Sequence, residues 1–196
     1  MPRLSPAPFE QYEPLFGADA HPRQQIYAHR PEIALKHAEF GRTLRQERIL
    51  PSRLVELVRL RVAFWNQCRS CMAARYEEAI DDGVTEALVC SLERPEEAED
   101  LTDAERAAIA FGDLMATNHH AIDESTFDRL REHFSEPEIV ELCMNVAWFV
   151  GYGRMAAILK VVDDLPERFR RDDERITPWG EGGVVVIGDA PAVRGR

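Results

Sequence analysis

The chain has 196 residues, a net charge of −11 and a pI near 5.0. Hydrophobic residues make up 45% of it and charged residues 30%, which is the mixture of an ordinary globular domain. This length suits one domain with a buried core. The acidic balance argues against a surface built for nucleic-acid phosphates or anionic lipid, so we expect neither nucleic acid nor membrane as a partner.

The start of the chain, MPRLSPAPFEQYEPLFG, has scattered prolines and lacks the apolar core of a secretory signal. The best apolar run, 142–150, is interrupted by Asn145 and ends at Gly151, which is too short to cross a bilayer. We therefore expect a cytoplasmic protein. In that compartment, a close cysteine pair is more often catalytic or metal-binding than a structural disulfide.

The first half of the chain predicts an arm followed by helices. Residues 1–22 carry five prolines and predict an irregular N-terminal arm. Helical periodicity begins near Arg23 and is clear over 31–46, where Pro31 suits the first helical turn. A helix restarts at Ser52 and is apolar nearly all round over 53–65, so we expect it to be buried on several sides.

Asn66 is predicted as the N-cap of a further helix over 67–82, which ends at Asp82-Gly83. The second half predicts two capping boxes, Thr102 with Glu105 and Ser135 with Glu138. The segment 151–153 predicts a kink or a close helix contact. The remaining predicted helices cover 84–90, 102–118, 123–134 and 135–164, with a linker over 119–123.

Residues 166–196 predict a C-terminal arm that packs on its own subunit or a neighbour, with a possible short strand over 184–187. The expected architecture is therefore an all-α domain over 23–165, between arms at 1–22 and 166–196.

The stretch NQCRSCMAARYE places Cys68 and Cys71 three residues apart. If Asn66 is the N-cap, Cys68 is the second helical residue, where unpaired backbone N–H groups stabilise a thiolate. Cys71 would follow one turn later on the same face, so the two sulfurs can meet. This pattern is typical of a reversible dithiol, although two buried unreactive cysteines remain the alternative.

A zinc site needs three or four ligands, and the remaining donors are poorly placed for one. The adjacent pair His119 and His120 is the only close one, while Cys90 and Cys143 are isolated. We therefore expect no metal and no cofactor. The two histidines are predicted as loop residues or partners of a helix C-terminus.

Glu56 lies in an otherwise apolar helix, which favours a functional or a paired carboxylate. Its simpler interpretation is an i,i+3 ion pair with Arg59. The aromatic residues are predicted to form core or subunit contacts, and a subset could line an apolar pocket beside the cysteines. They are Phe64, Trp65, Trp148, Phe149 and Tyr152.

The spacing around the cysteine pair resembles the E-x11-C-x2-C-x3-H signature of alkylhydroperoxidase D-like proteins. Eleven residues separate Glu56 from Cys68, two separate Cys68 from Cys71, and three follow Cys71 before the last position. These proteins belong to the carboxymuconolactone decarboxylase superfamily, and the resemblance extends over roughly residues 20–165. It implies an all-α homo-oligomer, often a trimer or a hexamer. It also implies that the two cysteines reduce hydroperoxides and are re-reduced by a dithiol partner.

The resemblance assigns roles to individual residues. Glu56 would be the relay acid and Cys68 with Cys71 the redox pair. Arg75 occupies the position of the family's histidine, and Ser70 that of the second histidine found in some members. Arginine stays protonated, so Arg75 can stabilise a Cys71 thiolate at i+4 but cannot carry a proton at neutral pH.

The acid role is thereby left open between Tyr76, a water held by Glu56, and His119. We expect a catalytic set of Cys68, Cys71, Glu56 and Arg75. The predicted function is a thiol-based oxidoreductase acting on organic hydroperoxides or disulfides. The alternatives are a lactone-processing decarboxylase and a non-catalytic helical oligomer that binds a ligand.

Overall fold

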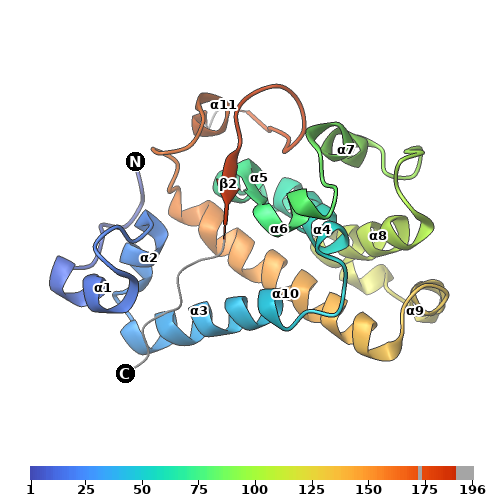
Figure 1. The fold of residues 1–196 in the computed structure, drawn as a ribbon, viewed down its shortest axis with the longest axis horizontal. Helices are drawn as coiled ribbons and strands as arrows, with labels where there is room; N and C mark the ends of the chain where they lie inside the picture. Colours follow the sequence, from blue (N-terminus) through green and yellow to red (C-terminus); the bar gives the residue numbers. More distant parts are fainter. Residues whose placement is uncertain (172–173, 189–196) are drawn as a thin grey trace.

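The structure is a computed structural model that describes residues 1–171 and 174–188. The parts of the predicted C-terminal arm at 172–173 and 189–196 lie outside these residues. Within the described ranges, the chain forms eleven α-helices, two short 3₁₀ helices and two three-residue strands (Figure 1). The prediction of an all-α body is confirmed.

The core is formed where α4 (Ser52–Asn66) packs against α8 (Asp103–Thr117) and α10 (Glu136–Leu159). Eight residues of α4 are buried, as its all-round apolar sequence predicts. The predicted close contact at 151–153 is also confirmed, because a Cβ added to Gly153 would lie 2.5 Å from the Asn66 amide nitrogen. Helix α10 is continuous through this segment.

Both predicted capping boxes are present, at the starts of α8 and α10, and Asp123 caps α9 (Glu124–Arg131). Two helices end earlier than predicted, at Arg131 and at Leu159. Lys160 ends α10 by adopting a left-handed conformation, with φ of 53°. The linker over 119–123 contains the 3₁₀ helix η2 (His119–Ala121). The helix predicted over 84–90 is shorter in the structure, where α7 (Glu86–Cys90) is followed by the 3₁₀ helix η1 (Ser91–Glu93).

The N-terminal arm is more ordered than its prolines predict. It contains α1 (Phe9–Phe16), which has Pro14 inside it, and α2 (Pro22–Tyr27) begins at its end. The arm is tied to the end of α10, because the backbone N–H of Arg3 donates to the Leu159 carbonyl at 3.0 Å.

Helix α3 (Pro31–Gln46) lies beside α10, as Figure 1 shows, and touches it through stacked rings. His37 lies 4.6 Å from Trp148 and 4.4 Å from Tyr152, measured between ring centroids. Trp148 and Tyr152 thus contact α3 at the edge of the body, whereas Phe64, Trp65 and Phe149 pack against the core as predicted. By length and composition alone α10 is long and apolar enough to cross a membrane, but it is the central core helix of this fold.

The largest departure from prediction is the region 67–82, which is not one helix. It divides into α5 (Arg69–Ala73), the strand β1 (Ala74–Tyr76) and α6 (Glu77–Asp81). The predicted C-terminal strand exists as β2 (Val185–Ile187) and pairs in parallel with β1, in the register Ala74 to Val185. The C-terminal arm, which includes α11 (Glu167–Arg170), therefore packs on its own chain.

Candidate redox site

Cys68 and Cys71 form a disulfide across α5, with their Cα atoms 5.2 Å apart. Helix α4 ends just before the pair, where Gln67 is left-handed with φ of 49° and the Cys68 N–H donates to the Ala63 carbonyl. Cys68 then becomes the N-cap of α5, and its sulfur accepts the Cys71 N–H at 3.3 Å. The prediction that Cys68 is the second residue of a helix capped by Asn66 is therefore wrong.

Asn66 has a different role, because it joins two helices. Its side-chain amide donates to the Phe149 carbonyl of α10 at 2.8 Å and its oxygen accepts from Arg154. Its short polar side chain suggested a helix start. In the structure its contacts with α10 instead keep Asn66 as the last residue of α4. The residue that follows is Gln67, so the sequence has no glycine to signal the end of this helix.

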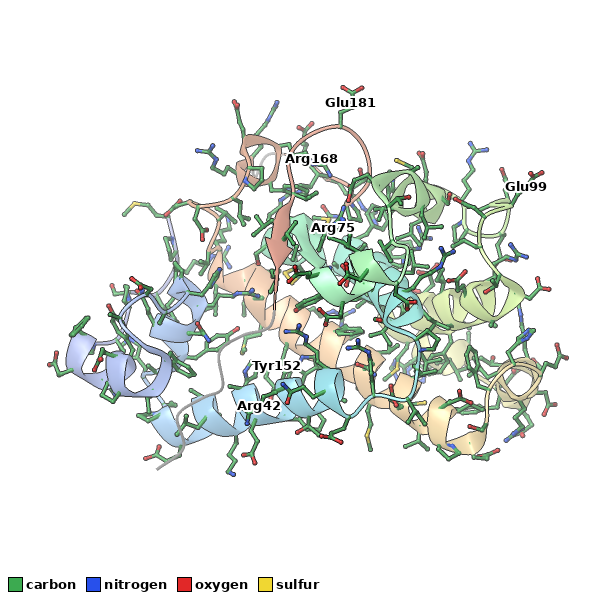
Figure 2. The ribbon with its side chains drawn as sticks, in the orientation of Figure 1. Arg42, Arg75, Glu99, Tyr152, Arg168 and Glu181 are labelled. Carbon is green, nitrogen blue, oxygen red and sulfur yellow. A yellow bond between two sulfur atoms is a disulfide. The ribbon has the colours of Figure 1, made fainter. Side chains whose placement is uncertain are left out.

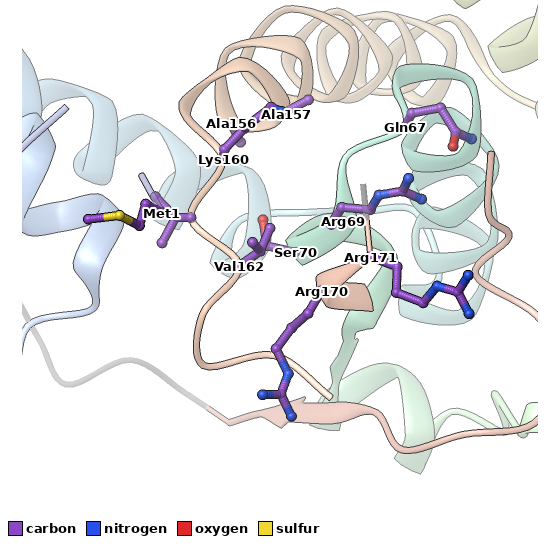
Figure 3. Close-up of a pocket in the computed structure, with 11 residues that line it drawn as sticks. Met1, Gln67, Arg69, Ser70, Ala156, Ala157, Lys160, Val162, Arg170 and Arg171 are labelled. Atoms are coloured by element: carbon purple, nitrogen blue, oxygen red, sulfur yellow. The ribbon is translucent and has the colours of Figure 1, made fainter. Parts of the chain in front are cut away.

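The two cysteines differ in exposure. Cys68 has no exposed surface, whereas Cys71 is partly exposed. Between them lies Ser70, which is 8% exposed and has its hydroxyl oxygen 3.7 Å from the Cys68 sulfur. Ser70 also lines a cavity of about 120 Å³ (Figure 3). The other walls come from Met1, Gln67, Arg69 and from the chain around 156–162 and 170–171.

This cavity is not the apolar pocket that was predicted beside the cysteines. None of the five aromatic residues predicted for that pocket lines it. Trp65 instead lines a shallow hollow nearby, together with Gln67, Arg69, Glu174 and Arg175. The two hollows near the disulfide are thus lined mainly by polar and cationic side chains, whereas Cys71 itself packs against an apolar cluster that includes Phe169.

Glu56 and Arg59 form a buried bidentate ion pair, with N–O distances of 2.6 and 2.7 Å and Glu56 only 2% exposed. The i,i+3 pairing that the sequence offered as an alternative is therefore present. The same guanidinium donates to the carbonyls of Cys71 at 2.7 Å and Ala74 at 2.8 Å. Burial lowers the pKa of Arg59, but Glu56, with smaller contributions from Tyr76 and Glu78, raises it by more, so this arginine stays charged.

Arg59 thus connects Glu56 to the redox segment. Glu56 makes no hydrogen bond to either sulfur in the part of the chain described, and its other partner is the Tyr76 N–H at 3.4 Å. The Tyr76 ring lies between the guanidinium groups of Arg45 and Arg59, at 4.6 and 5.0 Å. Glu56 and Cys71 are brought into one network, with Arg59 as the link.

Arg75 is 1% exposed and uses all five of its N–H donors. Two donate to the Glu86 carboxylate at 2.7 and 3.0 Å, and three donate to backbone carbonyls. Those carbonyls belong to Met72, Ala74 and Pro178. The expected placement of Arg75 at i+4 on a helix from Cys71 is wrong, because Arg75 lies in β1, and its donors are occupied elsewhere.

The C-terminal arm is fastened around this segment. The Gln67 side chain pairs with the Ile176 backbone through both its oxygen and its nitrogen, at 3.1 Å each. Arg168 donates to the carbonyls of Thr177, Pro178, Gly180 and Glu181 within the arm. In Figure 2, Arg168 and Arg75 lie below the loop that carries Glu181. Phe169 is fully buried against Met72 and Ala73.

The remaining candidates lie apart from the disulfide network. His119 and His120 are exposed in η2, and their rings lie 4.0 Å apart. Over residues 1–171 and 174–188, no group of three or more His, Cys, Asp or Glu side chains is arranged to hold a metal. The sequence did not identify Gln67 or Arg168 as site residues, since no motif distinguishes their bonds to the arm.

Comparison with known proteins supports a family assignment. Residues 31–114 match the Carboxymuconolactone decarboxylase family. An uncharacterized protein of Mycobacterium tuberculosis is 34% identical over 93 residues, which is 46% of this chain and 32% of that protein. The chain therefore spans about a third of the length of the curated relatives it matches.

Two solved structures share the fold. The first is an alkylhydroperoxidase AhpD core, an uncharacterized peroxidase-related protein from Ralstonia eutropha, with a TM-score of 0.64 and 20% identity over 76% of this chain and 78% of that one. The second is the debrominase Bmp8 in complex with 2,3,4-tribromopyrrole, with a TM-score of 0.61 and 19% identity over 76% and 80% of the two chains.

These likenesses define the class of the fold, an AhpD-like all-α domain. The likeness to the carboxymuconolactone decarboxylase family extends over residues 31–114, and the fold is shared with AhpD-like solved structures.

Proposed function

We propose that the protein is a thiol-based oxidoreductase that cycles Cys68 and Cys71 between dithiol and disulfide while it reduces a hydroperoxide. The observation that carries this proposal is the asymmetric disulfide. Cys71 is partly exposed, whereas Cys68 is fully buried and its sulfur accepts a backbone N–H. One sulfur is therefore accessible to an external reactant and the other is held to resolve it.

In this cycle, the Cys71 thiolate attacks the hydroperoxide, breaks the O–O bond and releases an alcohol, which leaves a sulfenic acid on Cys71. The Cys68 thiolate then attacks the Cys71 sulfur, the disulfide forms and the sulfenic oxygen leaves as water. An external dithiol restores the two thiols. In sum, hydroperoxide and dithiol give alcohol, water and a disulfide.

Arg59 is proposed as a positioning residue in this reaction. Its bonds to the Cys71 and Ala74 carbonyls fix the segment that carries the attacking sulfur, and Glu56 fixes Arg59. In our proposal Arg75 fixes the arm that covers the same segment, through Pro178. Both residues act on the site through the backbone.

The test is stopped-flow consumption of cumene hydroperoxide by the reduced protein with a dithiol donor. We expect Cys71→Ser to abolish turnover. Without the dithiol, Cys68→Ser should consume one equivalent of peroxide and accumulate a sulfenic acid that dimedone traps. Cys90→Ser, at an exposed and isolated cysteine, is the matched control and should keep the wild-type rate. Full activity in Cys71→Ser and Cys68→Ser would contradict the proposal.

A halogenated aromatic is a second electrophile to test, because Bmp8 has this fold and is a debrominase. The same dithiol can reduce a carbon–bromine bond, giving arene, bromide and a proton as the disulfide forms. Bromide release from 2,3,4-tribromopyrrole without peroxide turnover would favour this acceptor.

We also propose a homo-oligomer, with α10 as the contact surface. Val140, Met144 and Ile158 are 51%, 51% and 59% exposed and lie on one face of α10 at helical spacing. Burial of such a stripe between copies stabilises association. Light scattering after size exclusion should give a multiple of 22.3 kDa, and Met144→Asp should shift it toward the monomer. A wild-type monomer would exclude this surface as a contact.

A further inference from the structure

We propose that Ser70 donates the hydrogen bond that stabilises the Cys68 thiolate, and that the cavity it lines is the proton route to that sulfur. The proposal rests on the redox cycle above, in which Cys68 must become a thiolate in both directions.

Burial makes a donor necessary. Cys68 has no exposed surface, so bulk water cannot solvate its charged form, and a buried charge without partners is strongly unfavourable. Two groups lie within reach of its sulfur, the Cys71 N–H at 3.3 Å and the Ser70 hydroxyl at 3.7 Å. A backbone amide does not exchange protons on this timescale, whereas a hydroxyl donates one proton and accepts another.

The position of Ser70 connects the sulfur to the cavity. Ser70 is only 8% exposed, yet it forms part of the wall of the cavity of about 120 Å³, which is large enough for several waters. Neither cysteine is among the lining residues. Among the described residues that line the cavity, Ser70 is therefore the one with a hydrogen-bonding side chain within reach of the buried sulfur.

The charges around this site favour a thiolate. The ionisable side chains that line the cavity are all cationic, Arg69 from α5, Lys160 from the end of α10, and Arg170 with Arg171 from the α11 segment. In Figure 3, the guanidinium groups of Arg170 and Arg171 extend away from Ser70, so they act by their field rather than by contact.

Acidic groups offset part of this field. They are Glu174, which pairs with Arg171 at 3.5 Å, Asp163, which pairs with the Met1 ammonium group, and Glu56, which pairs with Arg59. The field of the cations is screened by salt, whereas a hydrogen bond from a hydroxyl is not. This difference separates the contribution of Ser70 from that of the lining charges.

Ser70 acts in both directions of the redox cycle. During reduction, an external thiolate attacks the Cys71 sulfur, a mixed disulfide forms and the electron pair of the broken S–S bond leaves on Cys68, where the Ser70 hydroxyl donates to it. During oxidation, the Cys68 thiol loses its proton through Ser70 to water in the cavity before it attacks the Cys71 sulfenic acid. A serine does not titrate near neutral pH, so no histidine-like step is expected in the rate.

The experiment is a pH titration of the reduced protein with ¹³C-labelled cysteine, followed by NMR, because the Cβ chemical shift reports the thiolate of a buried Cys68 without access by a reagent. Cys68→Ser and Cys71→Ser, in the same labelled protein, assign the resonances of the two thiols. Each thiol is therefore titrated separately within the intact chain. No peroxide turnover is needed.

We expect Ser70→Ala to raise the pKa of the Cys68 thiol by about one unit, which is a tenfold loss of thiolate at a pH below that pKa. The shift should persist in 1 M salt. Ser70→Thr, which keeps the hydroxyl, should remain close to wild type. Lys160→Gln is the electrostatic control and should give a smaller shift that disappears in high salt.

An unchanged Cys68 profile in Ser70→Ala would overturn the proposal. So would a shift that high salt removes, or an equal shift in Ser70→Thr, because either would indicate field or packing effects rather than a hydrogen bond. A Ser70-dependent pKa in a protein without peroxidase activity would refute only the proposed function. Peroxidase activity with a Ser70-independent pKa would refute only this inference.

Discussion

The helical body and the redox segment provide hydrogen-bond partners for their backbone N–H and C=O groups in different ways. In the body, α4, α8 and α10 pair their own N–H and C=O groups, and apolar side chains hold the helices together. In the redox segment, 67–76, and in the arm over 165–171 and 174–188, the helices and strands are short and side chains donate to several carbonyls. Arg59, Arg75 and Arg168 together donate to carbonyls from Cys71 to Glu181.

This difference predicts which substitutions destabilise each region. A helix keeps its hydrogen bonds when one surface side chain is lost, whereas an irregular segment loses the partner of a buried carbonyl. Arginine suits this role because its five donors reach several carbonyls at once. We therefore expect the redox segment to be sensitive to single arginine replacements, and the body to be sensitive to cavities.

The strongest test of this comparison is Arg59→Met. It leaves Glu56, which is 2% exposed, as a buried carboxylate without its ion-pair partner. It also removes a donor from the carbonyls of Cys71 and Ala74, of which Ala74 keeps Arg75. Removal of one partner of a buried pair costs about 3–5 kcal/mol, and we expect a loss of this size in urea unfolding.

The control for Arg59→Met is Arg94→Met, which breaks an ion pair with Glu97 between side chains that are 74% and 70% exposed. That change should cost no more than about 0.5 kcal/mol. The double replacement Glu56→Gln with Arg59→Met should recover part of the loss, because it removes the buried charge. Equal losses of stability in Arg59→Met and Arg94→Met would contradict the expected sensitivity of the redox segment to arginine replacement.

The second test is Arg75→Met, at the position where the family signature has histidine. It removes a donor from the carbonyls of Met72, Ala74 and Pro178, of which Ala74 keeps Arg59 and Pro178 keeps Arg168. Glu86 is 50% exposed and can be solvated. We expect a loss of about 2 kcal/mol. Hydrogen exchange should accelerate at the amides of β1 and β2, because Arg75 ties Pro178 of the arm to the redox segment.

Arg75→His sharpens this test. An imidazolium has two N–H donors where the guanidinium has five, so histidine should release the arm nearly as much as methionine does. Arg170→Met, at an exposed arginine of α11, is the control and should leave exchange at β2 unchanged. Wild-type exchange in Arg75→His would show that the arm does not depend on this arginine.

The same contrast explains what the sequence could predict. The body was predictable because its helices carry local signals, such as the capping box of Thr102 with Glu105 and the apolar run of α4. The signature at Glu56, Cys68 and Cys71 located the disulfide, and the ion pair of Glu56 with Arg59 followed from i,i+3 spacing.

The break after Asn66 was not predictable, because the left-handed residue is Gln67 rather than glycine. A non-glycine residue in this conformation costs about 1 kcal/mol. Its paired hydrogen bonds to Ile176, 109 residues away, offset that strain and exist only in the folded chain. For the same reason β1 could not be seen, since its partner β2 lies in the distant arm.

The smallest expected effect concerns an ion pair inside the body, where Arg53 binds Glu105 at 2.6 and 3.3 Å. Burial raises the pKa of the Glu105 carboxyl, but hydrogen bonds from Arg53 and the Thr102 N–H lower it by more, so it lies below its ordinary value of 4.5. A carboxyl with a lowered pKa stabilises the folded state above pH 4.5, and this stabilisation is lost as the pH falls through the folded value.

Arg53→Gln should therefore cost about 1 kcal/mol at neutral pH, a value reduced by the partial exposure of Arg53. The difference from wild type should shrink as the pH is lowered below 4.5, because protonation removes the charge that Arg53 pairs with. Urea unfolding at a series of pH values measures it, and Lys36→Gln, which breaks an exposed pair with Glu39, is the control. A loss that is independent of pH would mean that Arg53 acts by its bond to the Asp100 carbonyl, and that the body too relies on arginine to satisfy its backbone.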